Sequence, residues 1–446
     1  MPFSFDNASR LWGLKTYPLR EALNREFHAR PPEMVYPPLR AMHLVMVISP
    51  EQRDTVKEHE HISRLHRHFG LTVSDDHSST HTSMRCNERL LAKWERHLEF
   101  STYTFFYHGE FIDPFENVFQ KLMPEDWLSS IPGELLVATQ LALVPSSSSV
   151  YSPEQLSNLF NTPYLVGAQA LNGNASVFSN FLADSEGFSK ILVHDHHMTG
   201  HQAGRLVQRL LDIETYRAMA ILGFPRMRKL TEELERMELR LGSLTEMLAD
   251  NGNLSQEQRI LDDLMQLAGE TEHMVASFAY RFSAGQAYHA LVQHRLDELR
   301  ETRIEGLPTI REFLQRRFAP AMRTIDAAYA RQERLSRRVA RTATLLRTRI
   351  DVALAQQNRD LLASMNQRVK LQLRLQETVE GLSIFVLGYY MVSLIAYGYK
   401  ALDNLGLPIN LELVTAGTIP FVLIGIWLTI RWRRKKLMAS TSEGEH

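Results

Sequence analysis

The sequence predicts an α+β cytoplasmic domain, followed by long helices and two C-terminal transmembrane helices. Three observations predict this fold class. Short β-rich runs joined by turns fill residues 41–198, which is typical of α+β domains with a mostly antiparallel sheet. Residues 321–380 contain neither glycine nor proline, so nothing interrupts a helix there. Two apolar segments without charged side chains follow near the C-terminus.

The two apolar segments are 381–399 and 413–432, and the second carries no charged side chain from Leu413 to Ile430. A helix needs about 20 apolar residues to cross the hydrocarbon core of a bilayer. Backbone amides in lipid must form their hydrogen bonds inside their own segment, so helix is the expected state. Aromatic residues near the segment ends, Tyr397, Tyr399, Trp427 and Trp432, suit the headgroup region. A helical hairpin buried in a soluble core is the alternative interpretation.

Flanking charges predict the orientation. Arg431 and the basic run 433–436 lie at the outer end of the second segment, and Arg368, Lys370 and Arg374 precede the first. The connecting loop 400–412 carries a single basic residue, Lys400. Basic residues concentrate on the cytoplasmic side. We therefore expect the loop outside, the tail 433–446 in the cytoplasm, and both termini cytoplasmic. The first residues lack the pattern of a signal peptide.

Composition narrows the classes of function. The chain has 446 residues and a formal net charge of −1, which disfavours a nucleic-acid binder because such a protein needs a basic surface. Its one cysteine, Cys86, excludes internal disulfides and a cysteine-based zinc site. We found no phosphate-binding glycine loop, nucleophile elbow or other enzyme motif, so we expect no enzymatic activity.

The N-terminal half contains an arm and a domain. Residues 1–40 form the predicted arm, with a short helix over 19–27 and extended chain around the prolines that follow. Its charged string LNREFHARPPE either docks on the next domain or binds a partner. Residues 41–198 form the predicted α+β domain, in which Asn172-Gly173-Asn174 marks a hairpin between 164–171 and 175–182. The run 135–144 is a strand or a short helix.

The second half is predicted to be helical. Residues 199–319 contain helices over 200–222, 226–249 and 255–304, the last capped by Ser255. A stalk helix over 320–380 continues into the first span. Its apolar stripe steps by three or four residues, close to an eleven-residue repeat, and includes Leu335, Val339, Thr342, Leu346, Ile350, Ala353, Gln357 and Leu361. The stripe needs either the preceding helices or a coiled coil with other copies to cover it.

Three strings carry a resemblance: LNREFHARPP, HDHHMTGHQAGRLVQRLLDIETYRAMAILGFP and SIFVLGYYMVSLIAYGYKAL. They resemble a bacterial membrane-protein family defined by a conserved domain of unknown function, and the resemblance covers nearly the whole chain. The architecture is also similar to the CorA-type magnesium transporters. That likeness implies an inner-membrane homopentamer whose first span lines a pore. Those transporters carry Gly-Met-Asn after the first span, whereas this chain has Tyr397-Gly398-Tyr399, so magnesium selectivity does not carry over.

If the first span lines a pore, its small and polar residues are the candidates. Two residues of the loop, Asp403 and Asn404, could form an oxygen ring at the pore mouth, or simply cap the helix. Small residues equally allow close helix packing, and tyrosines equally belong to the interfacial belt. The pore-lining candidates are Ser383, Gly388, Tyr390, Ser393, Tyr397, Gly398 and Tyr399.

Histidines suggest a divalent-cation site. His194, Asp195, His197 and His201 are close in sequence, and imidazole with carboxylate suits zinc and related ions. Structural or surface roles are the alternative, with Asp195 capping a helix. A second histidine group occupies 59–81. A bound cation, magnesium or zinc, is the one cofactor that these patterns suggest.

Two functions remain open. The first is an oligomeric inner-membrane channel or transporter-like protein for cations, with membrane lipid and other copies of itself as partners. The second is a membrane-anchored scaffold that binds a partner and has no conduit.

Overall fold

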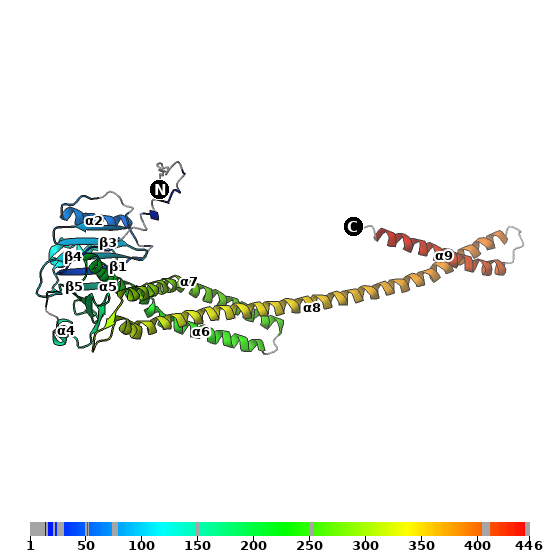
Figure 1. Ribbon diagram of the computed structural model, residues 1–446. Coiled ribbons are helices and arrows are strands. Elements are labelled where there is room, and N and C mark those ends of the chain that lie inside the picture. Colours follow the sequence, from blue (N-terminus) through cyan, green and yellow to red (C-terminus); the bar gives the residue numbers. More distant parts are fainter. Residues whose placement is uncertain are drawn as a thin grey trace. The chain divides into compact units, whose positions relative to one another are not determined.

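The structure confirms an α+β domain followed by long helices. It is a computed structural model that describes residues 14, 17–20, 23–24, 31–49, 51, 53–73, 79–148, 151–249, 253–403 and 411–441. A nine-stranded mixed sheet dominates the first part, and helices follow from residue 200 (Figure 1). The predicted helix over 19–27 lies mainly outside the described residues.

The strands form one sheet in the order β2-β3-β4-β1-β5-β8-β7-β6-β9. All neighbouring pairs are antiparallel except β5 and β8, which are parallel. The uncertain run 135–144 is a strand, and the Asn-Gly hairpin joins β6 to β7 as predicted. The strands are β1 (Leu39–Val47), β2 (His81–Arg85), β3 (Leu90–Arg96), β4 (Phe100–His108), β5 (Glu134–Val144), β6 (Val166–Ala170), β7 (Ala175–Ser179), β8 (Ser189–Asp195) and β9 (Thr302–Arg303).

Helices cover the two faces of the sheet. Side chains alternate along β1, so Met42 and Leu44 join the core beneath α2 while Val45 packs on the other face with Met219 of α5. The first face is also covered by α3, the 3-10 helix η1 and α4. These elements are α2 (Thr55–His68), α3 (Phe119–Leu122), η1 (Leu128–Ser130), α4 (Pro153–Leu159) and α5 (Gly200–Ile221).

Two details of the later helices differ from the sequence expectation. Helix α6 (Phe224–Ala249) is followed by α7 (Leu254–Leu299), which ends five residues before the predicted residue 304. Arg300 turns the chain with a φ of 46°, and β9 then pairs with β6. The cap of α7 is Asn253, whose Oδ1 accepts from the Gln256 amide at 3.0 Å, while the Ser255 hydroxyl donates to the same oxygen. Asn253 is the cap because it directly precedes the helix and its side chain reaches the amide of the third helical residue, Gln256.

The longest element is α8 (Ile310–Asp403), which begins ten residues before the predicted start at 320. Pro320 lies inside it, where we expected the helix to begin. A proline removes only one helical hydrogen bond, and buried Leu314, Phe318 and Met322 hold the turns on both sides. Packing therefore overrides the local cost of the proline.

By internal contacts the chain divides into two units. One comprises 1–250 and 262–342, and the other comprises 251–261 and 343–446. Within the first, Arg331 of α8 pairs with Glu238 of α6 at 2.6 Å, and Tyr329 stacks on Phe282 of α7. Within the second, Glu257 of α7 pairs with Arg349 of α8 at 2.9 Å.

Burial along α8 changes after Ile350. The stripe is buried at Leu335, Val339, Leu346 and Ile350, whereas Leu361 is 55% exposed. Exposed apolar side chains continue through 352–379. The predicted stripe is therefore covered in its first half only.

Helix α9 (Leu411–Thr441) follows α8. By length and composition, α8 is the one described helix that could cross a membrane. The apolar stretch described in α9, Ala416–Thr429, is shorter. The chain between the helices, 404–410, lies outside the described residues, and so does the candidate Asn404.

Candidate functional site

The described end of the N-terminal arm crosses the face of the sheet beside α5. Val35 donates its amide to the Gly200 carbonyl at 3.3 Å. The backbone of Glu33 lies where a β-carbon on Gly204 would stand, and the ring of Tyr36 lies in the same relation to Gly200. The two glycines, spaced four apart on one helix face, therefore open the groove that the arm occupies.

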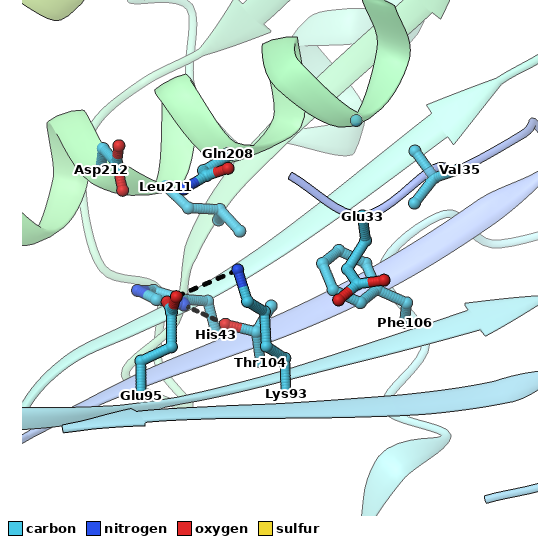
Figure 2. A pocket seen from close by; sticks show the side chains of 11 residues that line it. Glu33, Val35, His43, Lys93, Glu95, Thr104, Phe106, Gln208, Leu211 and Asp212 are labelled. Carbon is cyan, nitrogen blue, oxygen red and sulfur yellow. Dashed lines mark hydrogen bonds and ion pairs between the residues drawn. The ribbon is translucent and has the colours of Figure 1, made fainter. Parts of the chain in front are cut away.

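A small charged cavity lies under the arm. It measures about 30 Å³, which is room for one or two water molecules. Figure 2 shows its side chains, contributed by the arm, by strands β1, β3 and β4, and by α5. The lining residues are Glu33, Val35, His43, Lys93, Glu95, Thr104, Phe106, Gly204, Gln208, Leu211 and Asp212.

Lys93 links the arm to the sheet. Its ammonium group donates to the Pro31 carbonyl at 3.2 Å. It also pairs with Glu95, two residues along β3, at 3.0 Å (Figure 2). The side chains of Lys93 and Glu95 are only 8% and 13% exposed. A buried ammonium is stable when both a carboxylate and a carbonyl compensate its lost hydration. The arm therefore supplies, through the Pro31 carbonyl, one of the hydrogen-bond acceptors that the buried Lys93 ammonium needs.

His43 is held in its neutral form. Its Nδ1 lies 2.8 Å from the Thr104 hydroxyl, and its Nε2 lies 2.9 Å from the Thr215 hydroxyl. Thr215 already donates to the Leu211 carbonyl, so it accepts from Nε2, and Nδ1 accepts from Thr104. Burial, with smaller contributions from His97 and Lys93, lowers the pKa of His43 to about 3. The ring is a neutral connector between the sheet and α5.

Asp212 connects the cavity to α7. Its Oδ2 lies 2.8 Å from Nε of Arg295, which also pairs with Glu298 at 2.7 Å. Burial raises the pKa of Asp212 to about 6, against the opposite effect of Arg295. Asp212 is therefore ionised and paired at neutral pH. Lys93 is paired with Glu95 and Asp212 with Arg295, and the cavity is too small for a metabolite. These properties favour a role in docking the arm.

The arm and α5 belong to two of the strings that carry the family resemblance. LNREFHARPP ends at Pro32, and the second string contains the groove glycines Gly200 and Gly204. Their contact favours docking on the neighbouring domain for the described residues 31–36. Residues 25–30 lie outside the described part of the chain.

The predicted histidine site does not assemble. Asp195 Oδ1 accepts from the Met198 amide at 2.9 Å, and His194 Nε2 contacts the Ser148 carbonyl at 3.3 Å. Among the described residues no group of three histidine, cysteine or acidic side chains is placed to hold a metal ion. His197 lies before the start of α5 at Gly200, whereas His201 lies in its first turn, so the two do not share a helix face. Asp195 closes the turn before α5, whose N-cap is Thr199 and not Asp195 as the alternative expected.

The second histidine group is partly a buried packing cluster. His61 stacks on Trp127 with ring centroids 4.2 Å apart, and the Trp127 indole donates to the His61 carbonyl at 3.0 Å. His59 lies edge-on to Trp94. Burial lowers the pKa of His61 to about 4. These histidine rings pack in the core beneath α2.

The pore-lining candidates separate into different faces of α8. Gly388 is buried against α9, where an added β-carbon would lie 3.1 Å from Leu423. Ser383, Tyr390 and Tyr397 are spaced by seven and exposed, and at 100° per residue they lie about 180–220° around the helix from Gly388. We call these three residues the tyrosine stripe.

The other predicted pore residues offer less evidence about a pore face. The hydroxyls of Ser383 and Ser393 donate to carbonyls of their own helix, at Val379 and Tyr389. Gly398 is exposed, and the side chains of Tyr399 and Asp403 are outside the described part. Gly388 is thus a correction to the predicted pore face, because its missing side chain lets α9 approach.

The family follows from comparison with known proteins. A family model described as "Protein of unknown function (DUF3422)" matches residues 15–437, so the chain belongs to that family. No curated protein matches the chain. No solved structure matches it either.

Proposed function

We propose that this member of the family is a homo-oligomeric protein of the bacterial inner membrane whose first span lines a path for cations. The observation that carries the proposal is the tyrosine stripe on the face of α8 directed away from α9. In a bundle of copies with α9 outermost, this face points to the axis. Phenol hydroxyls there would offer a polar lining in an otherwise apolar helix.

Exposure of the stalk supports self-association. Leu361, Leu362 and Met365 are 55%, 66% and 61% exposed, and similar side chains continue toward the span. Exposed leucines at this density are costly in water and are typical of a surface covered by a partner. Neighbouring copies of the same helix would cover them in parallel and in register.

The arrangement of a long helix, a span, a short external loop, a second span and a basic tail resembles CorA-type transporters. We propose the same topology here, with two spans, both termini cytoplasmic and a pentamer as the first model to test. Flanking basic residues support the orientation. Because Tyr397-Gly398-Tyr399 replaces Gly-Met-Asn, the proposal concerns cations in general.

Cysteine accessibility tests the conduit. Ser383→Cys, Tyr390→Cys and Tyr397→Cys should react with a water-soluble thiol reagent in proteoliposomes, and modification should alter cation flux. Phe385→Cys is the matched control, since Phe385 is 71% exposed but lies on the side of α8 nearer Gly388. Equal protection of all four thiols, with no flux under any cation gradient, would refute the conduit.

A membrane-anchored scaffold is the second candidate. It is favoured by the same exposed stalk, which offers an apolar and basic surface to a partner of another kind. A scaffold predicts oligomers or partner complexes without flux. The native mass of the solubilised protein, measured together with flux, separates the two functions.

A further inference from the structure

The loop between β4 and α3 presents one apolar side chain to solvent. Ile112 is 104% exposed, more than any other large apolar residue in the described chain. Its neighbours are fixed: Phe115 is buried in the core beneath α4, and the Arg40 guanidinium lies 5.4 Å from the Phe111 ring. Arg40 also pairs with Glu116 at 3.4 Å. The loop is therefore anchored on both sides of an isoleucine that is held outward.

Acidic residues flank this isoleucine. Glu110 and Asp113 are both exposed. Oδ1 of Asp113 accepts from the Phe115 amide at 2.9 Å, which fixes the turn and leaves the carboxylate charge at the surface. We call residues 110–113 the isoleucine loop. A surface that receives it needs an apolar pocket with cations at its rim.

A groove of that kind exists elsewhere in the same unit. It has a volume of about 360 Å³ and lies between the chain segments 162–164 and 180–182, the end of α5 and the beginning of α8. Phe181 and Phe313 form its aromatic wall, with ring centroids 5.4 Å apart and planes 18° from parallel. Tyr164 and Leu182 are 84% and 66% exposed at its rim. We call this the aromatic groove.

Two arginines give the aromatic groove its charge. The guanidinium of Arg217 lies 5.5 Å from the Phe181 ring, and that of Arg317 lies 5.4 Å from the Phe313 ring. Arg217 is also paired with buried Glu214 at 2.9 Å. Arg317 is exposed and supplies the positive charge available to a ligand. The groove thus matches an apolar side chain accompanied by carboxylates.

The isoleucine loop does not fill the aromatic groove of its own chain, because Ile112 is fully exposed. The loop is anchored in the core beneath α4, whereas α5 and α8 form the groove. Two different surfaces of one domain that complement each other produce a head-to-tail contact. Such contacts close into rings when the rotation between copies permits.

We infer that the isoleucine loop of one copy inserts into the aromatic groove of the next copy. This contact joins neighbouring cytoplasmic domains, and it rests on the homo-oligomer of the proposed function. Ile112 is the apolar anchor, while Glu110 and Asp113 face Arg317. A buried anchor in a well-packed pocket, with polar groups at the rim, is the usual composition of an energetically important contact.

Cross-linking of the full chain in membranes tests the contact. Two differently tagged copies are co-expressed, one with Ile112→Cys and one with Leu182→Cys. We expect a disulfide-linked species that carries both tags. Native Cys86 stays in place, since burial raises the pKa of its thiol to about 11 and keeps it unreactive. Leu98→Cys, at a residue that is 70% exposed, replaces Ile112→Cys as the matched control and should give no link.

Charge reversal gives an independent readout. Arg317→Glu should lower the linked yield about fivefold, the effect of one exposed ion pair, and Asp113→Arg in the other copy should restore it. Absence of the link in a protein that keeps an oligomeric mass would overturn this contact and leave the conduit intact. A monomeric mass would overturn both proposals.

Discussion

The carbonyl of Glu33 occupies the position that a β-carbon on Gly204 would take. This relationship fixes the arm on α5 and explains a glycine inside a helix, where the residue is otherwise unfavourable. Glycine lowers the intrinsic stability of the helix at this position. The arm contact requires it, because any larger side chain would occupy the space of the Glu33 carbonyl.

Gly204→Ala should therefore destabilise the protein by about 1–3 kcal/mol, because the added methyl group must displace the arm backbone. The measurement is the free energy of unfolding of the full chain in detergent. Gly269→Ala is the control: Gly269 is an exposed position in α7 with open space around it, and alanine should stabilise that helix by about 0.5–1 kcal/mol. Equal effects at the two positions would contradict the arm contact.

Acid should weaken the fold through His43. Its pKa is about 3 in the folded chain and 6.5 in the unfolded chain. Between these values the unfolded chain binds the proton and the folded chain does not, so stability falls as pH falls below 6.5. The loss is about 1.4 kcal/mol per pH unit, or about 2 kcal/mol at pH 5. His61, with a pKa of about 4, acts in the same direction.

Unfolding followed by tryptophan fluorescence from pH 7 to pH 5 measures this slope. His43→Asn keeps a polar side chain between Thr104 and Thr215 but removes the titration, so the slope should flatten. An unchanged slope in that variant would exclude His43 as its origin.

Glu99 should be essential to the contact between the sheet and α7. It accepts two hydrogen bonds from Arg281, at 2.6 and 3.2 Å, and one from the Tyr288 hydroxyl at 3.0 Å. Glu99→Gln leaves a largely buried guanidinium without its counter-charge, which costs about 3–5 kcal/mol of unfolding free energy. Glu333→Gln breaks the exposed Arg337–Glu333 pair instead and should change stability by less than about 0.5 kcal/mol.

Gly388→Leu should separate the paired helices α8 and α9. The new side chain would meet Leu423, whose Cδ2 lies 3.1 Å from the position of an added β-carbon. Gly381→Leu is the control, since nothing lies within 4 Å of its β-carbon position. Thermal stability of the solubilised protein should fall for the first variant only. Equal losses would show that this packing is not specific.

Sequence reasoning recovered the elements whose signal is local. The Asn172-Gly173 turn predicts the hairpin of β6 and β7, and the run without glycine or proline predicts α8. The start of α8 was missed because a proline is normally a boundary, whereas here buried neighbours of Pro320 carry the helix across it. Strand β9 was missed because two residues carry no periodic pattern.

The site was harder to predict for a different reason. His194 and Asp195 are dense in the sequence, yet Asp195 caps a turn and no metal group forms among the described side chains. Conversely, Glu33 and Gly204 are 171 positions apart, and the only local signal was a pair of glycines in a helical pattern.

By itself, the sequence determined the α+β domain, the long helices and the apolar C-terminal segments, because turn chemistry, helix continuity and apolar length are local properties. Tertiary structure alone decided which glycines receive the arm and that Gly388 meets α9, which leaves open the face that carries Ser383, Tyr390 and Tyr397. These contacts depend on which surfaces the fold brings within van der Waals distance, and no neighbouring residue in the chain encodes that.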